Sequence, residues 1–192
     1  MARRLTRDFF ARATVDVARD LLGHRLVHAM GGQRLSGVVS ETEAYVGEGD
    51  LACHAKAGRT ARTVVMYGPP GYAYVYFTYG MHWMLNVITE SEGFPAAVLL
   101  RAVWPEEGIA VMRARRSRPD RILTDGPAKL TQAFGVDKAY NGLDMCVDDA
   151  TLYFEEAGGL PDGAQVTVGP RVGLGGTPEP WLSMPWNFRL ER

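Results

Sequence analysis

The feature that most constrains this fold is the stretch YVYFTYGMHWMLN, residues 74–86, in which one glycine separates two apolar runs. Aromatic and β-branched residues favour strands and Gly80 suits a tight bend, so the stretch predicts a β-hairpin. Bends normally carry small polar residues, whereas Tyr79 stands directly before this glycine. A packed aromatic sheet face explains the other tyrosines of the strand but leaves the ring at the bend without a structural role.

The apolar patterns along the chain predict an α+β fold with a mainly antiparallel sheet, because strands group early and helices lie at the start and in the middle. The expected helices cover residues 14–22, capped by Thr14 and ended by Gly23; a segment from Pro105 to the basic end Arg113, Arg115 and Arg116; and residues 127–134. The expected strands cover residues 24–30, 34–46, 72–79, 81–89 and 96–104. A chain of 192 residues fills one core, so residues 1–192 are expected to form a single domain.

The chain shows no sign of secretion or of a membrane span. Its first twenty residues mix basic and acidic side chains, and no segment approaches the roughly 20 apolar residues of a spanning helix. Two cysteines, Cys53 and Cys146, are too few for a disulfide framework. These features favour a reducing, cytoplasmic setting without a membrane partner.

The charge is unevenly distributed, although its net value is only −1. Residues 51–89 contain no acidic side chain but include Lys56, Arg59 and Arg62, and residues 113–121 are basic again. Residues 142–169 contain no basic side chain but carry Asp144, Asp148, Asp149, Glu155, Glu156 and Asp162. A polyanion responds to a local positive face, so a nucleic-acid partner stays open. Solvated loops are the alternative, which charge alone favours.

The motif ETEAY places two carboxylates on one face of an expected strand. Residues two apart in a strand lie about 6.5–7 Å from each other, so Glu41, Glu43 and Tyr45 point the same way. The opposite face then carries Val38, Thr42 and Ala44. Such a pair of acids suits a site where one carboxylate is a general base and the other binds an arginine or a backbone donor. An exposed face with two solvated acids is the alternative.

Metal and phosphate-loop chemistry have little support in the sequence. The two cysteines and the four histidines have no metal-ligand spacing, so we expect no metal site and no cofactor. The glycines of GPPGY, residues 68–72, fit neither a phosphate loop nor a dinucleotide fingerprint and are interpreted as turns.

The surroundings of Tyr79 suggest what its ring does. Alternation along YAYVYFTY puts Tyr72, Tyr74 and Tyr76 on one face and Ala73, Val75, Phe77 and Tyr79 on the other, with Tyr79 beside the bend. An exposed ring flanked by acid-free sequence suits insertion between stacked bases. Proteins that unstack DNA use such wedges, and enzymes that work on a base must first extrude it.

Several blocks follow one another along the chain: SGVVSETEAYVG, a histidine at position 54, YAYVYFTYGMHWMLNV, AAVLLRAV, DGPAKLTQA and RVGLG. Their order resembles that of the alkyladenine (3-methyladenine) DNA glycosylase family, and the similarity runs from about residue 16 to residue 189. The resemblance implies a single compact domain with a curved, mainly antiparallel sheet, flanking helices and a protruding β-hairpin.

The resemblance also implies roles for individual residues. Glu43 matches the general base that activates water, Arg101 an arginine that holds this water, and Val172 a residue whose backbone carbonyl does the same. The walls of the base pocket are matched by Tyr45, His54, Tyr76, Leu99 and Asn86, the last of which crowds the exocyclic amine of guanine. Tyr79 matches the intercalating tyrosine, and Met81 matches a hairpin residue in the minor groove.

The activity that these roles imply is that of a monofunctional DNA repair glycosylase. Such an enzyme flips alkylated or deaminated purines out of double-stranded DNA and hydrolyses the N-glycosidic bond, leaving an abasic site. No lysine lies in the matching pocket motifs, so base release without strand cleavage is expected. The enzyme is also expected to be a monomer. Arg59, Arg62 and Lys129 are candidate contacts to the DNA backbone. Compared with longer family members, the chain is expected to lack a further segment after PWNFRLER, which either weakens DNA contacts or only trims a surface.

Two other functions stay open at this point. A non-catalytic nucleic-acid-binding module would keep the hairpin but would not need Glu43 and Arg101. A hydrolase of free nucleosides or small glycosides would need the carboxylates but not Tyr79. The choice among 3-methyladenine, 7-methylguanine, hypoxanthine and ethenoadenine depends on the width of the pocket, which strand-level reasoning does not resolve.

Overall fold

The longest strand, β2 (Gln33–Val46), organises the sheet. Its first half pairs with β1 (Arg25–Met30), its residues 41–43 pair with β8 (Asn187–Leu190), and β5 (Ala96–Glu107) runs along most of its length. Every one of these pairings is antiparallel. β2 therefore connects the two ends of the sheet, and its ETEAY motif lies where β5 and β8 flank it.

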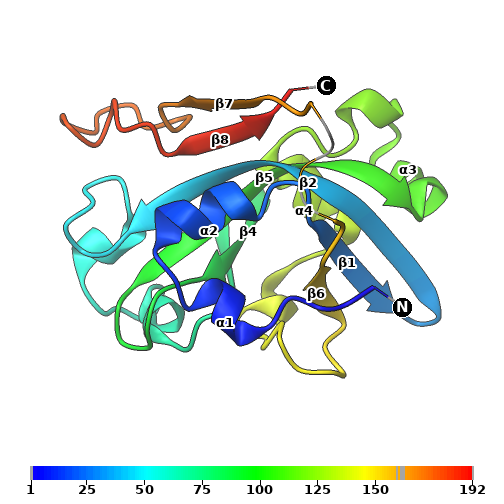
Figure 1. Cartoon of the computed structure of the whole chain (residues 1–192), viewed down its shortest axis with the longest axis horizontal. Helices are drawn as coiled ribbons and strands as arrows, with labels where there is room; N and C mark the ends of the chain where they lie inside the picture. The colour runs from blue at the N-terminus through cyan, green and yellow to red at the C-terminus, as the bar shows by residue number, and fades with distance from the viewer. Residues whose placement is uncertain (1, 159, 161–162, 192) are drawn as a thin grey trace.

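The predicted hairpin is confirmed. It consists of β3 (Ala73–Thr78) and β4 (His82–Ile88), paired from Ala73↔Val87 to Thr78↔His82. The strand order is β3-β4-β5-β2-β1-β6; in addition, β8 pairs with β2, and β7 pairs with β8. Three of these strands had no counterpart in the sequence expectations: β6 (Leu152–Glu155), β7 (Val166–Gly169) and β8. Figure 1 shows the sheet curving around the helices, with the β7–β8 ribbon crossing above β2.

The computed structural model describes residues 2–158, 160 and 163–191, so Asp162 of the acidic stretch lies outside the described residues. The α-helices are α1 (Arg7–Phe10), α2 (Thr14–Asp20), α3 (Ile109–Arg116) and α4 (Pro127–Phe134). The short 3₁₀ turns are η1 (His54–Ala57), η2 (Val64–Tyr67), η3 (Asp120–Ile122) and η4 (Lys138–Tyr140). No helix in the described part of the chain is long and apolar enough to cross a membrane.

The predicted helices are confirmed to different degrees. α4 has its predicted bounds and ends at Gly135, whose φ of +71° suits glycine. α2 ends at Asp20, three residues before Gly23, and its N-cap is Ala13. The capping prediction for Thr14 is wrong, because the Thr14 hydroxyl and amide both donate to the Glu90 carboxylate, at 2.8 and 2.7 Å.

The helix predicted to begin at Pro105 begins instead at Ile109, because β5 continues to Glu107. Pro105 lies opposite Gly37 at a register shift in the β2–β5 ladder, where a missing N–H is tolerated. The next two residues, Glu106 and Glu107, belong to the strand. They form ion pairs with Arg25 and Arg34, respectively. Basic residues do occupy the last turn of α3, as predicted.

A bulge at Ser40 changes which side chains of β2 face the core. The register with β5 shifts between Val39 and Glu41, so the alternation reverses there. The prediction for Val38 is therefore wrong: Val39 is fully buried in the main core and Val38 is half-buried. Thr42 and Ala44 face inward as expected, and the Thr42 hydroxyl donates to the Ala18 carbonyl of α2 at 2.6 Å.

The two faces of the hairpin sheet pack against different clusters. The main core receives the Ala73 and Val75 side of β3 together with the apolar sides of α2 and α4. The opposite side of β3 carries Tyr74, which packs with Tyr72 and Tyr76 in a second, smaller cluster. The predicted alternation is thus confirmed within β3, and the compact α+β domain confirms the predicted fold class. The prediction for Tyr79 is wrong, because the strand ends at Thr78 and the positive φ of Tyr79 turns its ring toward the side of Tyr74 and Tyr76. The aromatic side of the hairpin is left for a binding site.

Candidate active site

A cavity of about 410 Å³ opens on the side of β3, β4 and β5 that faces away from the main core. Its other walls come from the η1 turn and from the loop of residues 172–177. We call it the aromatic cavity, because its wall includes Tyr45, His54, Tyr74, Tyr76 and Tyr79. Predicted pocket residues Tyr45, His54, Tyr76, Asn86 and Leu99 all line it, as do Tyr79, Arg101 and Val172.

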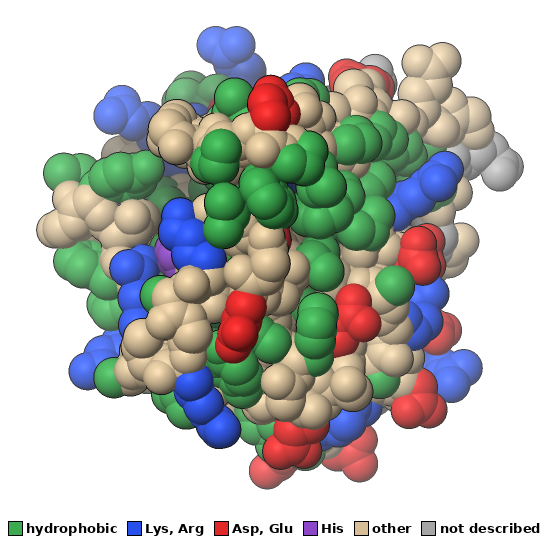
Figure 2. All heavy atoms as spheres, turned by 90° about the vertical axis from the view of Figure 1, so that its left-hand side faces the viewer, with side chains coloured by type: hydrophobic (Ala, Val, Ile, Leu, Met, Phe, Trp, Pro, Cys, Tyr) green, Lys and Arg blue, Asp and Glu red, His purple; other side chains and the backbone are tan. Residues whose placement is uncertain are grey.

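On the face of the molecule drawn in Figure 2, charged and apolar side chains lie in different regions. Figure 2 shows Lys and Arg side chains along the left edge of this face, with most Asp and Glu side chains in its centre and right. Hydrophobic side chains gather above, over the loop between β7 and β8, where Val172 and Leu182 are exposed. The molecule thus presents a local positive edge despite its net charge of −1.

The rings of the aromatic cavity hold one another in place. The His54 ring packs edge-on against Tyr76, with centroids 4.5 Å apart, and Tyr74 and Tyr76 lie 5.4 Å apart. Arg62 Nη2 approaches His54 Nε2 at 3.4 Å; because a guanidinium only donates, Nε2 is the acceptor. His54 Nδ1 then carries the proton and donates to the Tyr74 hydroxyl at 3.1 Å.

Burial favours the uncharged forms of His54, Cys53 and Tyr76 in this cavity. Desolvation lowers the pKa of His54 to about 4, with the nearby Arg62 and Lys56 adding to the effect. Desolvation also raises the pKa of the Cys53 thiol to about 12 and raises the pKa of the Tyr76 hydroxyl. The cavity therefore presents neutral rings at neutral pH, a surface suited to a flat aromatic ligand.

Glu43 lies directly behind the cavity wall, and its side chain is fully buried. Oε1 accepts from the Val172 amide at 2.6 Å and from Asn187 Nδ2 at 3.1 Å. Oε2 accepts from the Tyr45 hydroxyl at 2.9 Å and pairs with Arg101 Nη1 at 3.3 Å. The buried carboxylate thus accepts three hydrogen bonds and lies beside one guanidinium, which excludes the alternative of a solvated acid.

Arg101 joins the two acids of the ETEAY motif. Its Nε donates to Glu41 Oε1 at 2.6 Å while its Nη1 reaches Glu43. Asn187 Nδ2 bridges the same two carboxylates, at 2.9 Å from Glu41 and 3.1 Å from Glu43. The arginine and the asparagine therefore hold both acids, and the backbone donor, Val172, binds Glu43. No group of three His, Cys, Asp or Glu side chains that could hold a metal ion occurs among the described residues.

The end of the hairpin projects Tyr79 and Met81 into solvent, with exposed fractions of 79% and 67%. Tyr79 has a φ of +53° and Gly80 a φ of +68°, the pattern that a type I′ turn requires. A bulky residue in this region is strained, and such strain concentrates at functional sites. Tyr79 also borders the aromatic cavity, so one side chain connects the protruding end with the pocket.

The three candidate DNA-backbone residues lie in different surroundings. Arg62 turns toward the cavity wall, where its guanidinium lies over the Tyr76 ring at 5.1 Å. Arg59 lies over the Tyr67 ring at 5.4 Å, and Lys129 pairs with Asp125 at 2.9 Å on the exposed side of α4. Lys56, which the sequence did not suggest as a pocket residue, also lines the cavity and donates to the Leu51 carbonyl at 2.6 Å.

Sequence reasoning missed three residues that build the site. Asn187 bridges the two acids from β8, a strand that was not predicted. Arg171 and Asp50 form a buried ion pair beside Tyr45. The only sequence signal for Arg171 is its place in the RVGLG block, directly before Val172.

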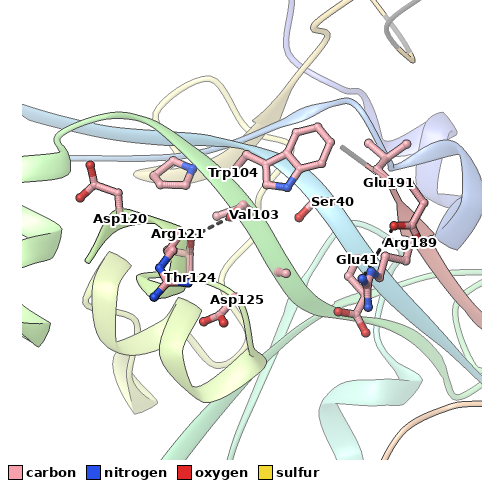
Figure 3. Close-up of a pocket in the computed structure, with 13 residues that line it drawn as sticks. Ser40, Glu41, Val103, Trp104, Asp120, Arg121, Thr124, Asp125, Arg189 and Glu191 are labelled. Carbon is pink, nitrogen blue, oxygen red and sulfur yellow. Dashed lines mark hydrogen bonds and ion pairs between the residues drawn. The ribbon is translucent and has the colours of Figure 1, made fainter. Parts of the chain in front are cut away.

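A second cavity, of about 450 Å³, lies on the other side of the Arg101–Glu41 pair, because Glu41 lines it while Arg101 lines the aromatic cavity. We call it the charged cavity, since its wall includes Glu41, Asp120, Arg121, Asp125, Arg189 and Glu191. Figure 3 shows residues 120–125 on one side and Glu41 with Arg189 on the other, with the Trp104 indole above them.

Comparison with known proteins agrees with this geometry. The profile of the family described as Methylpurine-DNA glycosylase (MPG) matches residues 8–192. Three similar proteins carry the name "Putative 3-methyladenine DNA glycosylase". The one from Methanocella arvoryzae is 45% identical over 96% of this chain and 90% of its own length, and the one from Myxococcus xanthus is 46% identical over 97% and 88%. The one from Desulfitobacterium hafniense is 42% identical over 98% and 96%. The chain belongs to the methylpurine-DNA glycosylase family, whose members are enzymes of DNA repair.

Proposed function

We propose that the protein flips an alkylated or deaminated purine out of duplex DNA and hydrolyses its N-glycosidic bond with water activated by Glu43. The observation that carries this proposal is the place of Glu43, a buried carboxylate directly behind the wall of an aromatic cavity that borders an exposed tyrosine. A base-excising enzyme needs these parts together: a wedge, a base pocket and a carboxylate beside the sugar.

Tyr79 is the wedge in this mechanism. Its ring stands at the end of a two-stranded projection, with Met81 beside it, so both can enter a groove without the body of the protein in the way. Inserted rings unstack neighbouring bases and fill the gap left by an extruded nucleotide. The basic side chains of the acid-free segment, Arg59 and Arg62, and Lys129 on α4 supply attraction for the phosphates.

The aromatic cavity receives the extruded base. Its volume of about 410 Å³ lies within the range of small-molecule sites, about 300–1,000 Å³. Stacking on rings such as Tyr76 contributes about 1–3 kcal/mol per base, and an electron-poor alkylated purine favours electron-rich faces further. The Asn86 side chain is fixed by its bond to the Tyr74 carbonyl at 3.0 Å, so it forms a rigid wall against larger exocyclic groups.

The chemical step exchanges one bond for another at the sugar carbon C1′. The glycosidic bond breaks with its electron pair leaving on the base, and the oxygen of water bonds to C1′ while Glu43 takes the proton. Developing positive charge on the sugar is stabilised by the same carboxylate. Arg101 and the Val172 backbone orient Glu43 and the water. A cationic alkylated base leaves as a neutral molecule without an acid, whereas an uncharged deaminated purine leaves as an anion that takes a proton from solvent.

Base release without strand cleavage is supported by the placement of Lys56. This lysine lines the aromatic cavity, but its Nζ is bound to the Leu51 carbonyl at 2.6 Å and the bond is exposed. It is therefore not held as a desolvated nucleophile beside the carboxylates. Reduction with borohydride during turnover tests this: we expect no covalent protein–DNA adduct.

The test of the proposed function is base release from duplex oligonucleotides that contain one modified purine, under single-turnover conditions. Glu43→Gln should bind the lesion duplex like the wild type and release the base about 10²–10⁴-fold more slowly. The matched control is Glu92→Gln, an exposed acid outside the cavity, which should leave the rate unchanged. Wild-type binding without release would indicate a non-catalytic module, and equal activity on free modified nucleosides would indicate a nucleoside hydrolase.

A further inference from the structure

Asp50 and Arg171 form the most deeply buried ion pair of the described residues, with exposed side-chain fractions of 1% and 0%. The guanidinium binds the carboxylate with two parallel bonds, Nη1 to Oδ2 at 2.5 Å and Nη2 to Oδ1 at 2.9 Å. A buried charge pair is weak support for stability, since desolvation offsets the attraction. Among the described residues Arg171 Nε finds no acceptor, which adds a further cost. Stability alone therefore does not explain the pair.

The pair joins segments that meet around the active site. Asp50 also accepts from the Val46 and Ala52 amides, at 3.1 and 3.0 Å, which fixes the turn between β2 and the cavity wall. Arg171 also donates to the Ala44 carbonyl at 2.9 Å, directly beside Glu43 in β2. Its guanidinium lies over the Tyr45 ring at 4.7 Å, so it also packs against a wall of the aromatic cavity.

The residue after Arg171 is the one that reaches the catalytic carboxylate. Val172 is exposed to 56%, yet its backbone amide donates to Glu43 Oε1 at 2.6 Å. The Val172 side chain is not packed in the core, so it does not hold the amide in place. The segment between Val172 and β8 contains no strand or helix that could hold it either. The side chain of Arg171, tied to Asp50 and β2, is the anchor that places this amide.

We propose that Asp50 and Arg171 are positioning residues: their buried pair holds the Val172 amide on Glu43 and so fixes the orientation of the carboxylate and one wall of the aromatic cavity. The inference rests on the proposed role of Glu43 as the general base. Without the pair the loop still covers the cavity, but the amide no longer meets the carboxylate in one geometry.

The experiment compares Arg171→Lys with Arg34→Lys. Arg34 makes the matching two-bond contact with Glu155 at the far end of β2, so this control removes the same fork away from the cavity. Both variants should lose thermal stability. Only Arg171→Lys should lower the single-turnover rate per folded molecule, by about 10–100-fold, while the affinity for lesion DNA changes less than about threefold.

A second measurement reads the positioned amide directly. Hydrogen exchange of the Val172 amide should be faster in Arg171→Lys than in the wild type. The amides of β1 should exchange at the same rate in these two proteins. If Arg171→Lys does not fold, the uncharged pair Asp50→Asn with Arg171→Gln replaces it, since it leaves no buried charge unpaired. An unchanged rate per folded molecule, or a Val172 amide that stays protected, would overturn the inference. Full activity of Glu43→Gln would instead refute the proposed function, while the exchange result would still stand.

Discussion

The aromatic and charged cavities are nearly equal in volume, about 410 and 450 Å³, and the Arg101–Glu41 pair lies between them. They differ in what shifts the pKa values of their titratable side chains. In the aromatic cavity desolvation dominates, and it lowers the pKa of His54 to about 4. In the charged cavity ion pairing dominates: hydrogen bonding from Arg113 lowers the pKa of the Asp120 carboxyl. Size alone thus does not distinguish the two cavities, whereas their linings do: aromatic rings dominate one wall and paired charged groups the other.

The difference originates in the strands that meet at the shared wall. β3 and β4 contribute alternating aromatic and apolar side chains to one cavity. The other cavity is closed by the η3 region and β8, which bring Asp120, Asp125 and Arg189. Glu43 is fully buried, and three of its partners, Tyr45, Arg101 and Val172, line the aromatic cavity, while the fourth, Asn187, comes from β8. Most contacts of Glu43 are therefore with residues of the aromatic cavity, the side on which the proposed chemistry takes place.

Among the substitutions that compare the two cavities, removal of a ring from the aromatic cavity should have the largest effect, on the affinity for lesion DNA. Tyr76→Ala should weaken binding of lesion DNA about 10–100-fold, because stacking contributes about 1–3 kcal/mol per base. Tyr76→Phe keeps the ring and should bind within about threefold of wild type. The measurement is the dissociation constant for a lesion duplex, taken in the Glu43→Gln background to prevent turnover. Equal binding by the alanine variant would remove the aromatic cavity as the base site.

Changing the shared wall should have a smaller effect. Glu41→Gln takes one charged partner from Arg101 but leaves its contact with Glu43, so we expect a rate about tenfold lower, the lower end of what a charge-assisted hydrogen bond contributes. Single-turnover release measures it, with lesion affinity as the parallel readout. A loss as large as that of Glu43→Gln would mean that the two acids act as one unit and that the division between them is wrong.

The sequence predicted those parts that local patterns determine. The hairpin around Gly80 and α4 between Pro127 and Gly135 follow from alternation and from end signals within a few residues. The extension of β5 through Pro105 did not follow, because a proline with two following glutamates also begins a helix. The extension depends on pairing with a distant strand, since β5 continues along β2 to Ser36↔Glu107 and its glutamates meet Arg25 and Arg34 there.

The candidate site divides in the same way. ETEAY and the tyrosines could be read from spacing and from the family resemblance, and the structure brings them together around one cavity. Asn187 contacts Glu43 across 144 positions, and Arg171 contacts Asp50 across 121. No periodic pattern connects residues so far apart, and the bulge at Ser40 that aligns β2 with β5 leaves no local signal either. Contacts of this kind needed the folded chain.

The desolvation of His54 in the aromatic cavity should make the free energy of unfolding depend on pH in the acid range. The pKa of His54 is lowered from 6.5 to about 4, so between these values the unfolded chain binds a proton that the folded chain does not. The free energy of unfolding therefore falls as the pH drops from about 6.5 to about 4, by at most about 1.4 kcal/mol per pH unit for this group. His54→Gln should reduce that slope in urea titrations, whereas His82→Gln, at the exposed hairpin end, serves as the control. An unchanged slope in His54→Gln would place the effect in other groups.

The smallest effect is expected from the charged cavity itself. Arg121 lines it, and among the described residues its side chain forms no hydrogen bond or ion pair, so a ligand held there would draw on this guanidinium. Because the chemistry faces the other cavity, Arg121→Gln should change the rate and the lesion affinity less than about twofold at moderate salt, apart from the loss of one distant charge. The same single-turnover and binding measurements, repeated at low and high salt, decide it. A loss as large as that of Tyr76→Ala, persisting at high salt, would show that the charged cavity contacts the substrate directly and that the two cavities work together.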